Sequence, residues 1–185
     1  MRKMYLSAPL PFVGQKRMLA KEFMKVLEQY PDGTLFVDLF GGSGLLSHIT
    51  KSLKPHSTVI YNDFDNYRFR MKHIPQTNQL LADIREMVGN SVPRHKIIKG
   101  ELRERIFSRI EQEENSTGYV DFITLSSSIL FSMKYKLSVQ DMRKEALYNN
   151  IRKTGYPECT DYLEGLEIVS CDYKEVFNRY KDIPG

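Results

Sequence analysis

The chain has 185 residues, of which 41% are hydrophobic and 27% charged, and a formal net charge of +4. This is an ordinary globular composition. The two cysteines of the chain are too few for a disulfide framework, and its four histidines lack metal-ligand spacing. No apolar run is long enough to span a membrane. We therefore expect a cytoplasmic protein with no metal site, whose mildly basic surface permits nucleic-acid binding without requiring it.

The chain begins with segments that alternate between helix and strand. Apolar residues at helical spacing predict a helix over residues 15–30, which residues 31–33 (PDG) end. Residues 34–39 and 58–61 are apolar and predict two buried strands, with a helix over residues 43–53 between them. A helix of crossover length between two strands predicts that the strands are adjacent and parallel.

The middle of the chain is predicted to be helical, and its last part returns to the sheet. Middle helices are expected over residues 66–89 with a break near Pro75, over 94–114, over 119–135, and after Ser138, which caps the last of them. Residues 166–170 predict a third strand, and residues 172–180 a further helix. The predicted fold class is α/β, with a sheet domain over residues 1–67 and 160–185 and a mainly helical insert over residues 68–159.

A glycine-rich turn follows the first predicted strand, and Asp63 follows the second. Glycines let the backbone approach a ligand where a Cβ atom would clash. A glycine turn after one strand and an acid after the next is how α/β sheets hold a nucleoside, because the acid accepts hydrogen bonds from two ribose hydroxyls. The alternative is that these glycines serve only the conformation of the turn.

The order of short motifs decides between classes of nucleoside-binding protein. Leu45 and Leu46 stand where the dinucleotide fingerprint G-x-G-x-x-G would place its third glycine, and the Walker phosphate loop is absent. Residues 38–44 (DLFGGSG) instead resemble motif I of S-adenosylmethionine (SAM) methyltransferases. Residues 11–19 (PFVGQKRML) resemble the P-F-x-G-x-K-x-x-L block of Dam-type (class alpha) adenine-specific DNA methyltransferases, and the motifs come in that family's order.

The resemblance implies a Rossmann-like SAM-dependent methyltransferase sheet with an insert that recognises DNA. It also implies SAM as cofactor, double-stranded DNA as partner, and a restriction endonuclease of the same system as a further candidate partner. Within it, Lys16 pairs with the SAM carboxylate, Phe12 faces the adenine or the sulfonium, and Asp63 holds the ribose. The cofactor-binding residues that it assigns are Phe12, Lys16, Asp38, Phe40, Gly41, Gly42, Ser43, Gly44, Asp63 and Asp172.

Two of these residues have a structural alternative. Asp38 is suited to cap the glycine turn by accepting hydrogen bonds from backbone N–H groups. Asp172 stands where the family places an acid near the SAM adenine amino group, and aspartate also suits the N-cap of the helix predicted there. These two roles of Asp172 are compatible.

The catalytic motif of the family, [DNS]-P-P-[YFW], is absent, because the sequence contains no consecutive prolines. No catalytic residue is therefore assigned, and the predicted sheet is interpreted as incomplete. The sequence predicts a site-specific DNA adenine N6-methyltransferase, which transfers a methyl group from SAM to adenine in DNA, in a truncated form expected to be inactive alone. The alternative is a non-catalytic protein with a methyltransferase fold that binds DNA or a protein partner.

Basic residues of the insert are candidates for contacts with DNA phosphates. Residues 94–99 and 134–136 are favoured because they carry little negative charge, whereas the mixed charges of residues 101–114 are equally typical of a solvated helix face. Asn149, Asn150 and Arg152 are candidates, among many other residues, for reading base edges.

Overall fold

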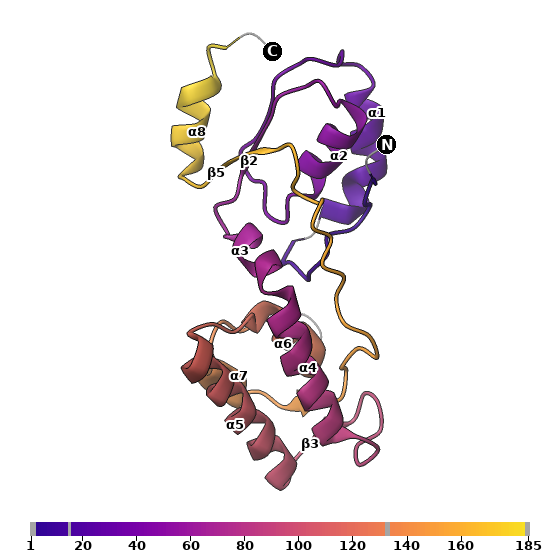
Figure 1. The fold of residues 1–185 in the computed structure, drawn as a ribbon, viewed down its shortest axis with the longest axis vertical. Coiled ribbons are helices and arrows are strands. Elements are labelled where there is room, and N and C mark those ends of the chain that lie inside the picture. Colours follow the sequence, from indigo (N-terminus) through magenta and orange to yellow (C-terminus); the bar gives the residue numbers. More distant parts are fainter. Residues whose placement is uncertain (1–2, 15, 132–133, 184–185) are drawn as a thin grey trace. The chain divides into compact units, whose positions relative to one another are not determined.

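A computed structural model of the chain describes residues 3–14, 16–131 and 134–183. The chain divides into two compact units (Figure 1). Unit 1 comprises Met1–Met71 and Cys159–Gly185, and unit 2 comprises Lys72–Glu158. Unit 1 is built from two stretches that are far apart in the sequence.

Unit 1 contains a three-stranded parallel sheet in the order β1-β2-β5, formed by β1 (Phe36–Asp38), β2 (Val59–Asn62) and β5 (Glu167–Val169). Phe36 pairs with Val59, and Ile60 pairs with Glu167, so all three strands run in one direction. The prediction of adjacent parallel strands at residues 34–39 and 58–61 is confirmed. The central strand β2 is buried throughout, whereas β1 and β5 are partly exposed.

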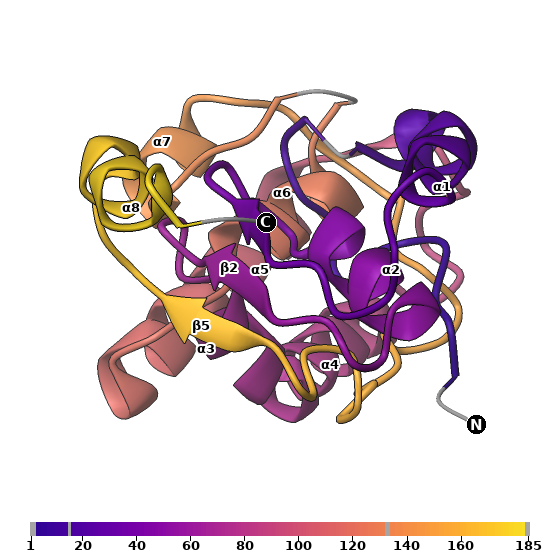
Figure 2. The ribbon, with the colours of Figure 1, turned by 90° about the horizontal axis from the view of Figure 1, so that it is seen from above.

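Helices cover both faces of this sheet. Figure 2 shows α1 and α2 on one side of the strands and α8 on the other. Ala20 and Leu27 of α1 pack against Leu45 and Ile49 of α2, and Phe36 of β1 adds to this apolar cluster. The helical elements of unit 1 are η1 (Lys16–Leu19, a 3-10 helix), α1 (Ala20–Leu27), α2 (Leu45–Leu53), α3 (Tyr67–Lys72) and α8 (Tyr173–Tyr180).

The first predicted helix is shorter and less regular than expected. Gln15, its predicted first residue, lies outside the described residues. The helix opens as a 3-10 turn at Lys16 and ends at Leu27, after which residues 28–30 form a turn. The 3-10 opening places the Lys16 side chain beside the glycine turn, which matters for the site below.

His48 of α2 joins three distant segments of unit 1. Its ring is fully buried and stacks on Tyr162, with ring centroids 4.7 Å apart. Its Nε2 accepts the Tyr5 backbone N–H at 2.9 Å, so Nδ1 carries the proton and donates to the Tyr162 carbonyl at 2.7 Å. The N-terminal segment and the segment that enters β5 are thus both attached to α2.

The described residues of unit 2 are mainly helical and include a two-stranded antiparallel ladder. In the ladder, β3 (Ile97–Ile98) pairs with β4 (Leu147–Tyr148). Ile106, Phe107 and Ile110 of α5 are fully buried. The helices of unit 2 are α4 (Ile74–Val88), α5 (Gly100–Thr117), α6 (Phe122–Ile129) and α7 (Val139–Arg143).

Several predicted helix boundaries in the middle of the chain need correction. The break predicted near Pro75 is confirmed, because α3 ends at Lys72 and α4 begins at Ile74; Pro75 lies in the first turn of α4, where its missing N–H is tolerated. The helix expected from residue 94 begins only at Gly100, because Ile97–Ile98 pair with β4. The helix expected over residues 119–135 is only Phe122–Ile129.

The expected cap of α7 is confirmed. The Ser138 side chain accepts the Asp141 backbone N–H at 3.2 Å, which supplies a partner for one of the free donors at the helix N-terminus. Asp121 caps α6 in the same way, with Oδ1 accepting the Thr124 N–H at 3.0 Å.

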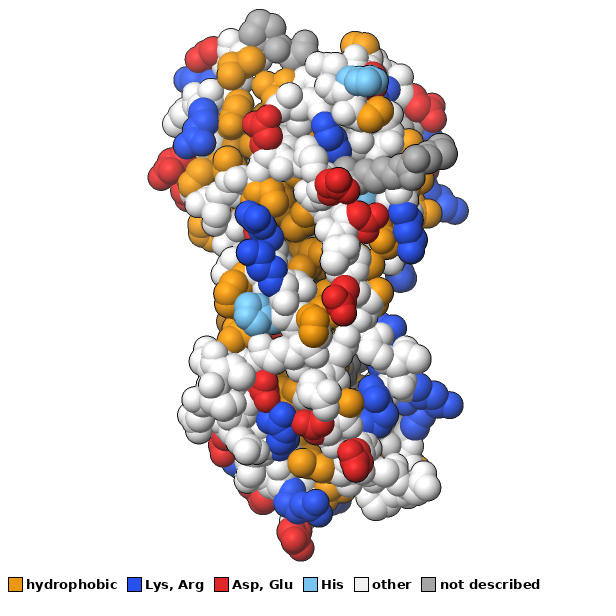
Figure 3. All heavy atoms as spheres, in the orientation of Figure 1, with side chains coloured by type: hydrophobic (Ala, Val, Ile, Leu, Met, Phe, Trp, Pro, Cys, Tyr) orange, Lys and Arg blue, Asp and Glu red, His pale blue; other side chains and the backbone are white. Residues whose placement is uncertain are grey.

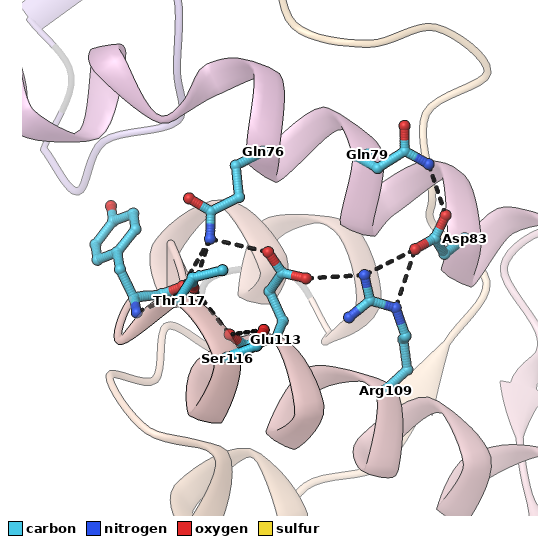
Figure 4. Close-up of polar contacts among 8 residues, drawn as sticks. Gln76, Gln79, Asp83, Arg109, Glu113, Ser116 and Thr117 are labelled. Carbon is cyan, nitrogen blue, oxygen red and sulfur yellow. Dashed lines mark hydrogen bonds and ion pairs between the residues drawn. The ribbon is translucent and has the colours of Figure 1, made fainter.

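Polar side chains join α4 to α5 (Figure 4). The Arg109 guanidinium lies 2.9 Å from Asp83 and 2.8 Å from Glu113. Gln76 donates to the other Glu113 oxygen at 2.9 Å. A cationic side chain of the charged helix is therefore neutralised by acids within unit 2.

Candidate functional site

A cavity of about 330 Å³ opens at the carboxyl ends of β1 and β2, inside unit 1. Ligands of open α/β sheets bind at this end of the strands. The volume is within the range of small-molecule sites. The cavity is lined by Phe12, Gly14, Lys16, Leu39, Phe40, Gly41, Gly42, Ser43, Leu45, Asn62, Phe64, Asp65, Asp172 and Tyr173.

The glycine turn rests on the buried side chain of Tyr61. The Tyr61 hydroxyl lies 2.7 Å from the Gly42 carbonyl oxygen and 3.0 Å from Asp63 Oδ1, so its one proton is shared between two acceptors. Burial, together with the adjacent Asp63 charge, raises the pKa of Tyr61 and keeps the hydroxyl protonated. A Cβ atom at Gly41 would lie 2.3 Å from the Tyr61 ring, so this glycine is required by packing.

The conformation of the turn explains the other glycines. Gly42 has φ +51° and Gly44 has φ +70°, values that glycine adopts without strain. Gly44 is also the N-cap residue of α2. The conformational explanation of the glycine pattern therefore holds at these two positions, alongside the close packing at Gly41.

Lys16 and Asp38 meet beside the turn. Lys16 Nζ donates to the Phe40 carbonyl at 2.5 Å and lies 3.7 Å from Asp38 Oδ1, while Asp38 Oδ2 accepts the Ser47 hydroxyl at 2.7 Å. Asp38 thus bonds to side chains rather than capping the turn through backbone N–H groups. The Lys16 side chain remains 32% exposed, and it lines the cavity. It is available to an anionic group of a ligand.

Asp63 is buried behind the cavity rather than on its lining, and it is 4% exposed. Its Oδ1 accepts the Tyr67 N–H at 2.6 Å, and its Oδ2 accepts the Arg68 N–H at 2.9 Å. These donors are the first backbone groups of α3, which need partners at a helix N-terminus. Asp63 therefore joins the end of β2, the start of α3 and the Tyr61 hydroxyl.

Two exposed residues of the loop after β2 reach the cavity lining. Phe64 is 66% exposed, and Asp65 is the carboxylate of this loop that lies on the lining. On the same lining, Phe40 is 63% exposed and its ring lies 5.1 Å from that of Tyr173. Exposed aromatic rings in a cavity offer flat apolar faces to a ligand, as a stacked base requires.

Asp172 combines two positions. Its side chain accepts the Lys174 N–H at 2.8 Å as the N-cap of α8, and it also lines the cavity. The expected capping role is confirmed. Because the residue is exposed, its second oxygen can face a ligand.

The cavity brings together most of the predicted site residues. Those on the lining are Phe12, Lys16, Phe40, Gly41, Gly42, Ser43 and Asp172. Asp38, Gly44 and Asp63 lie outside it and support the residues that form it. Sequence reasoning missed Asn62, Phe64, Asp65 and Tyr173, although the loops that follow parallel strands are where such residues are found.

The model of the D12 class N6 adenine-specific DNA methyltransferase family matches residues 12–158. The chain belongs to this family. The match begins at Phe12, on the cavity lining, and extends through the glycine turn and the whole of unit 2. Asp172 and Tyr173 lie outside it.

A relative from Haemophilus influenzae, provisionally named a methyltransferase, is 39% identical to this D12-class chain over 185 residues. The alignment covers 98% of the chain and 62% of the relative. The chain thus spans less than two thirds of the relative's length, and more than a third of the relative lies outside the match.

Within residues 3–14, 16–131 and 134–183, no group of three or more His, Cys, Asp or Glu side chains is placed to hold a metal ion. In the same part of the chain, no helix combines the length and apolar character needed to cross a membrane.

Replacing Asp63 by asparagine should destabilise unit 1, whereas the same change at Asp65 should not. Asparagine keeps one oxygen but loses the second acceptor, so a buried N–H of α3 or the Tyr61 hydroxyl is left without a full partner. We expect Asp63→Asn to lower the free energy of unfolding by about 1–2 kcal/mol and Asp65→Asn to change it by less than about 0.5 kcal/mol. Urea unfolding followed by circular dichroism measures both. Equal effects would contradict the supporting role of Asp63.

Proposed function

We propose that the chain carries the cofactor site and the DNA-binding unit of a site-specific DNA adenine N6-methyltransferase that uses SAM. Membership of the D12 class supports the reaction. The observation that carries the proposal is the convergence of residues from three separate stretches on one cavity at the carboxyl ends of parallel strands. These are Lys16, the glycine turn and Asp172.

The chemistry of the lining fits SAM, which joins a cationic amino-acid part to a ribose and an adenine. Lys16 offers a cation to the carboxylate of the amino-acid part. Phe12, Phe40, Phe64 and Tyr173 offer aromatic faces to the adenine and to the sulfonium. Asp172 offers an acceptor to the adenine amino group. We therefore assign the part of the cavity lined by the aromatic residues and Asp172 to the nucleoside, and the part lined by Lys16 to the methionine group.

The ribose is the group whose partner is least obvious from sequence. An ionised carboxylate offers about four acceptor sites, and Asp63 already accepts from Tyr67, Arg68 and Tyr61. Asp63 therefore retains one acceptor position, fewer than the two ribose hydroxyls that the sequence pattern assigns to it. Asp65, exposed on the lining, supplies a second carboxylate within the same loop.

When bound, SAM supplies an electrophilic methyl group for the amino group of an adenine flipped out of the duplex. The part of the chain in this step is to hold and orient the cofactor, because positioning supplies much of the rate in a transfer between two bound molecules. The rigid turn over Tyr61 suits that task. Its backbone is held by a buried side chain on one side and by the Lys16 ammonium on the other.

Calorimetry with S-adenosylhomocysteine, the demethylated product, tests the cofactor site. Lys16→Gln should weaken binding by about tenfold, the loss expected for one hydrogen bond to a charged group. Lys25→Gln is the matched control, because Lys25 is exposed and paired with Glu22 on α1, away from the cavity. Equal affinities for the parent and Lys16→Gln would exclude Lys16 as a cofactor contact, and no binding by the parent would contradict the cofactor proposal.

The proposed DNA surface lies on the β3–β4 ladder of unit 2. Two segments that contain no acidic residue, residues 87–99 and 146–157, come together there. The His95 N–H donates to the Asn149 carbonyl at 2.9 Å, and the Asn149 N–H donates to the Lys96 carbonyl at 2.9 Å. The five exposed cations that this pairing gathers, here called the basic ladder, are Arg94, Lys96, Lys99, Arg152 and Lys153.

Among the described residues, no ion pair joins the basic ladder to an acidic side chain, whereas several other cations of unit 2 do lie in ion pairs. Lys134 and Lys136, predicted as a second candidate surface, both lie within 3.0 Å of Glu145. Arg143 is bound by Glu104 and Glu111. Contacts with phosphates depend on cations that are free to replace counterions, so the basic ladder is the better candidate.

The salt dependence of DNA binding tests this surface. Lys96→Gln and Arg152→Gln should each weaken binding to duplex DNA, and each should reduce the slope of log affinity against log salt by about one. Lys134→Gln, the matched control, should leave affinity and slope unchanged because Glu145 already neutralises that lysine. Fluorescence anisotropy with a labelled duplex measures both. If the slope of log affinity against log salt fell for Lys134→Gln and for neither ladder variant, the basic ladder would be excluded as the DNA surface.

A second candidate function is a non-catalytic protein that keeps the methyltransferase fold and binds DNA or a protein partner. The observation that favours it is the absence of two consecutive prolines, and hence of [DNS]-P-P-[YFW], from the 185 residues. Base stacking on the aromatic residue of such a motif is worth roughly 1–3 kcal/mol. We expect the 185-residue chain alone to transfer no labelled methyl group from SAM to unmethylated DNA. Sequence-specific label in adenine would exclude the non-catalytic candidate.

A further inference from the structure

One buried side chain joins the loops that follow β1 and β5, on either side of the central strand. Asn62 is the last residue of β2, and it is 1% exposed. Its Nδ2 donates to the Leu39 carbonyl after β1 at 3.1 Å and to the Cys171 carbonyl after β5 at 2.9 Å. Its Oδ1 accepts the Cys171 N–H at 3.2 Å. We call Asn62 with these three hydrogen bonds the amide clamp.

The amide clamp requires a side chain that both donates and accepts. Turning the Asn62 amide around would place its oxygen against two carbonyl oxygens and its NH2 group against the Cys171 N–H, so one orientation is possible. Both carbonyls accept from a single nitrogen. The two loops therefore cannot separate without breaking a hydrogen bond of a buried group, and a buried polar group left without a partner is costly.

The residues next to the clamped ones line the cavity. Phe40 follows Leu39, and Asp172 and Tyr173 follow Cys171. The rings of Phe40 and Tyr173 lie 5.1 Å apart, but they are 63% and 42% exposed. Figure 3 shows hydrophobic side chains gathered at the surface on the side of unit 1 that carries α8, the helix that Tyr173 begins. Contact between two such exposed rings restrains the loops less than a buried amide does.

We propose that Asn62 is a positioning residue, whose amide sets the separation of the β1 and β5 loops and thereby the width of the part of the cavity that receives the nucleoside. The inference rests on the cofactor site proposed above. Asn62 acts through Phe40, Asp172 and Tyr173 rather than on the methyl group that is transferred. An aspartate at this position would have nearly the same shape, but its ionised carboxylate would offer only acceptors to two carbonyl oxygens.

Fluorescence of the ligand-free chain tests the amide clamp separately from the cofactor. The sequence contains no tryptophan, so Tyr173→Trp introduces a single reporter into the β5 loop. In this background, Asn62→Asp should shift the emission to longer wavelength and increase quenching by acrylamide, because the indole moves from the Phe40 ring into water.

Asn78→Asp is the matched control for both measurements. Asn78 of α4 makes the same kind of contacts within unit 2, where its Nδ2 donates to the Tyr156 carbonyl at 2.8 Å and its Oδ1 accepts the Tyr156 N–H at 2.7 Å. It is not on the cavity lining. The Trp emission should therefore stay unchanged in Asn78→Asp, and an emission equally unchanged in Asn62→Asp would overturn the inference.

Calorimetry with S-adenosylhomocysteine, in the chain that keeps Tyr173, tests the link to the cofactor. Asn62→Asp should weaken binding by about tenfold or more, and Asn78→Asp should bind like the parent. If the parent bound the product and Asn62→Asp bound it equally well, the positioning role alone would be overturned. If the parent bound no product, the proposed cofactor would fail and the positioning role with it, even where the emission had shifted.

A second variant covers the case in which Asn62→Asp fails to fold. Asn62→Ser introduces no charge, and its hydroxyl has one proton, so it can donate to one of the two loops at most. Both Asn62→Ser and Asn78→Asp should lower the midpoint of urea unfolding, because each removes buried hydrogen bonds. Only Asn62→Ser should also weaken binding of S-adenosylhomocysteine, by several fold. Parent-like affinity in a folded Asn62→Ser chain would reduce Asn62 to a purely structural role and overturn the inference.

Discussion

The packing of Tyr61 beneath the glycine turn is the contact on which the rest of unit 1 depends. The ring occupies the space that any side chain at Gly41 would need, and the hydroxyl contacts both Gly42 and Asp63. Because Tyr61 belongs to the buried central strand β2, it fixes the position of the turn relative to the sheet. The turn can then bring its backbone close to a ligand and still stay rigid. A rigid turn holds a bound molecule in a fixed position, which transfer between two bound molecules requires.

Asp63 extends this arrangement from the turn to the neighbouring loop. A buried carboxylate must be well supplied with hydrogen bonds, and here two come from the N-terminus of α3 and one from Tyr61. The same contacts fix the loop that presents Phe64 and Asp65 to the cavity. A residue expected to act on the ligand therefore has a structural role as well, and the two roles are not exclusive.

Ion pairs within unit 2 determine which of its charged side chains are neutralised. Four cations of the unit each form an ion pair with a carboxylate of the same unit: Arg109, Arg143, Lys134 and Lys136. Their positive charges are therefore neutralised within unit 2. The cations of the β3–β4 ladder have no such ion pair among the described residues, and they come from segments that are more than forty residues apart in the sequence. A surface that attracts phosphates can therefore arise on a chain whose overall charge is only mildly positive.

The sequence by itself determined the features that rest on local chemistry. The apolar runs of β1 and β2, the glycines at positive φ, and the Ser138 and Asp172 caps all follow from side-chain type and spacing over a few residues. Tertiary structure alone decided that Asp63 lies behind the cavity while Asp65 lines it, that Glu145 neutralises Lys134 and Lys136, and that Ile97–Ile98 form a strand rather than the start of α5. Each of these outcomes depends on a partner from a separate element, and burial and pairing with such a partner outweigh the local preference of the segment.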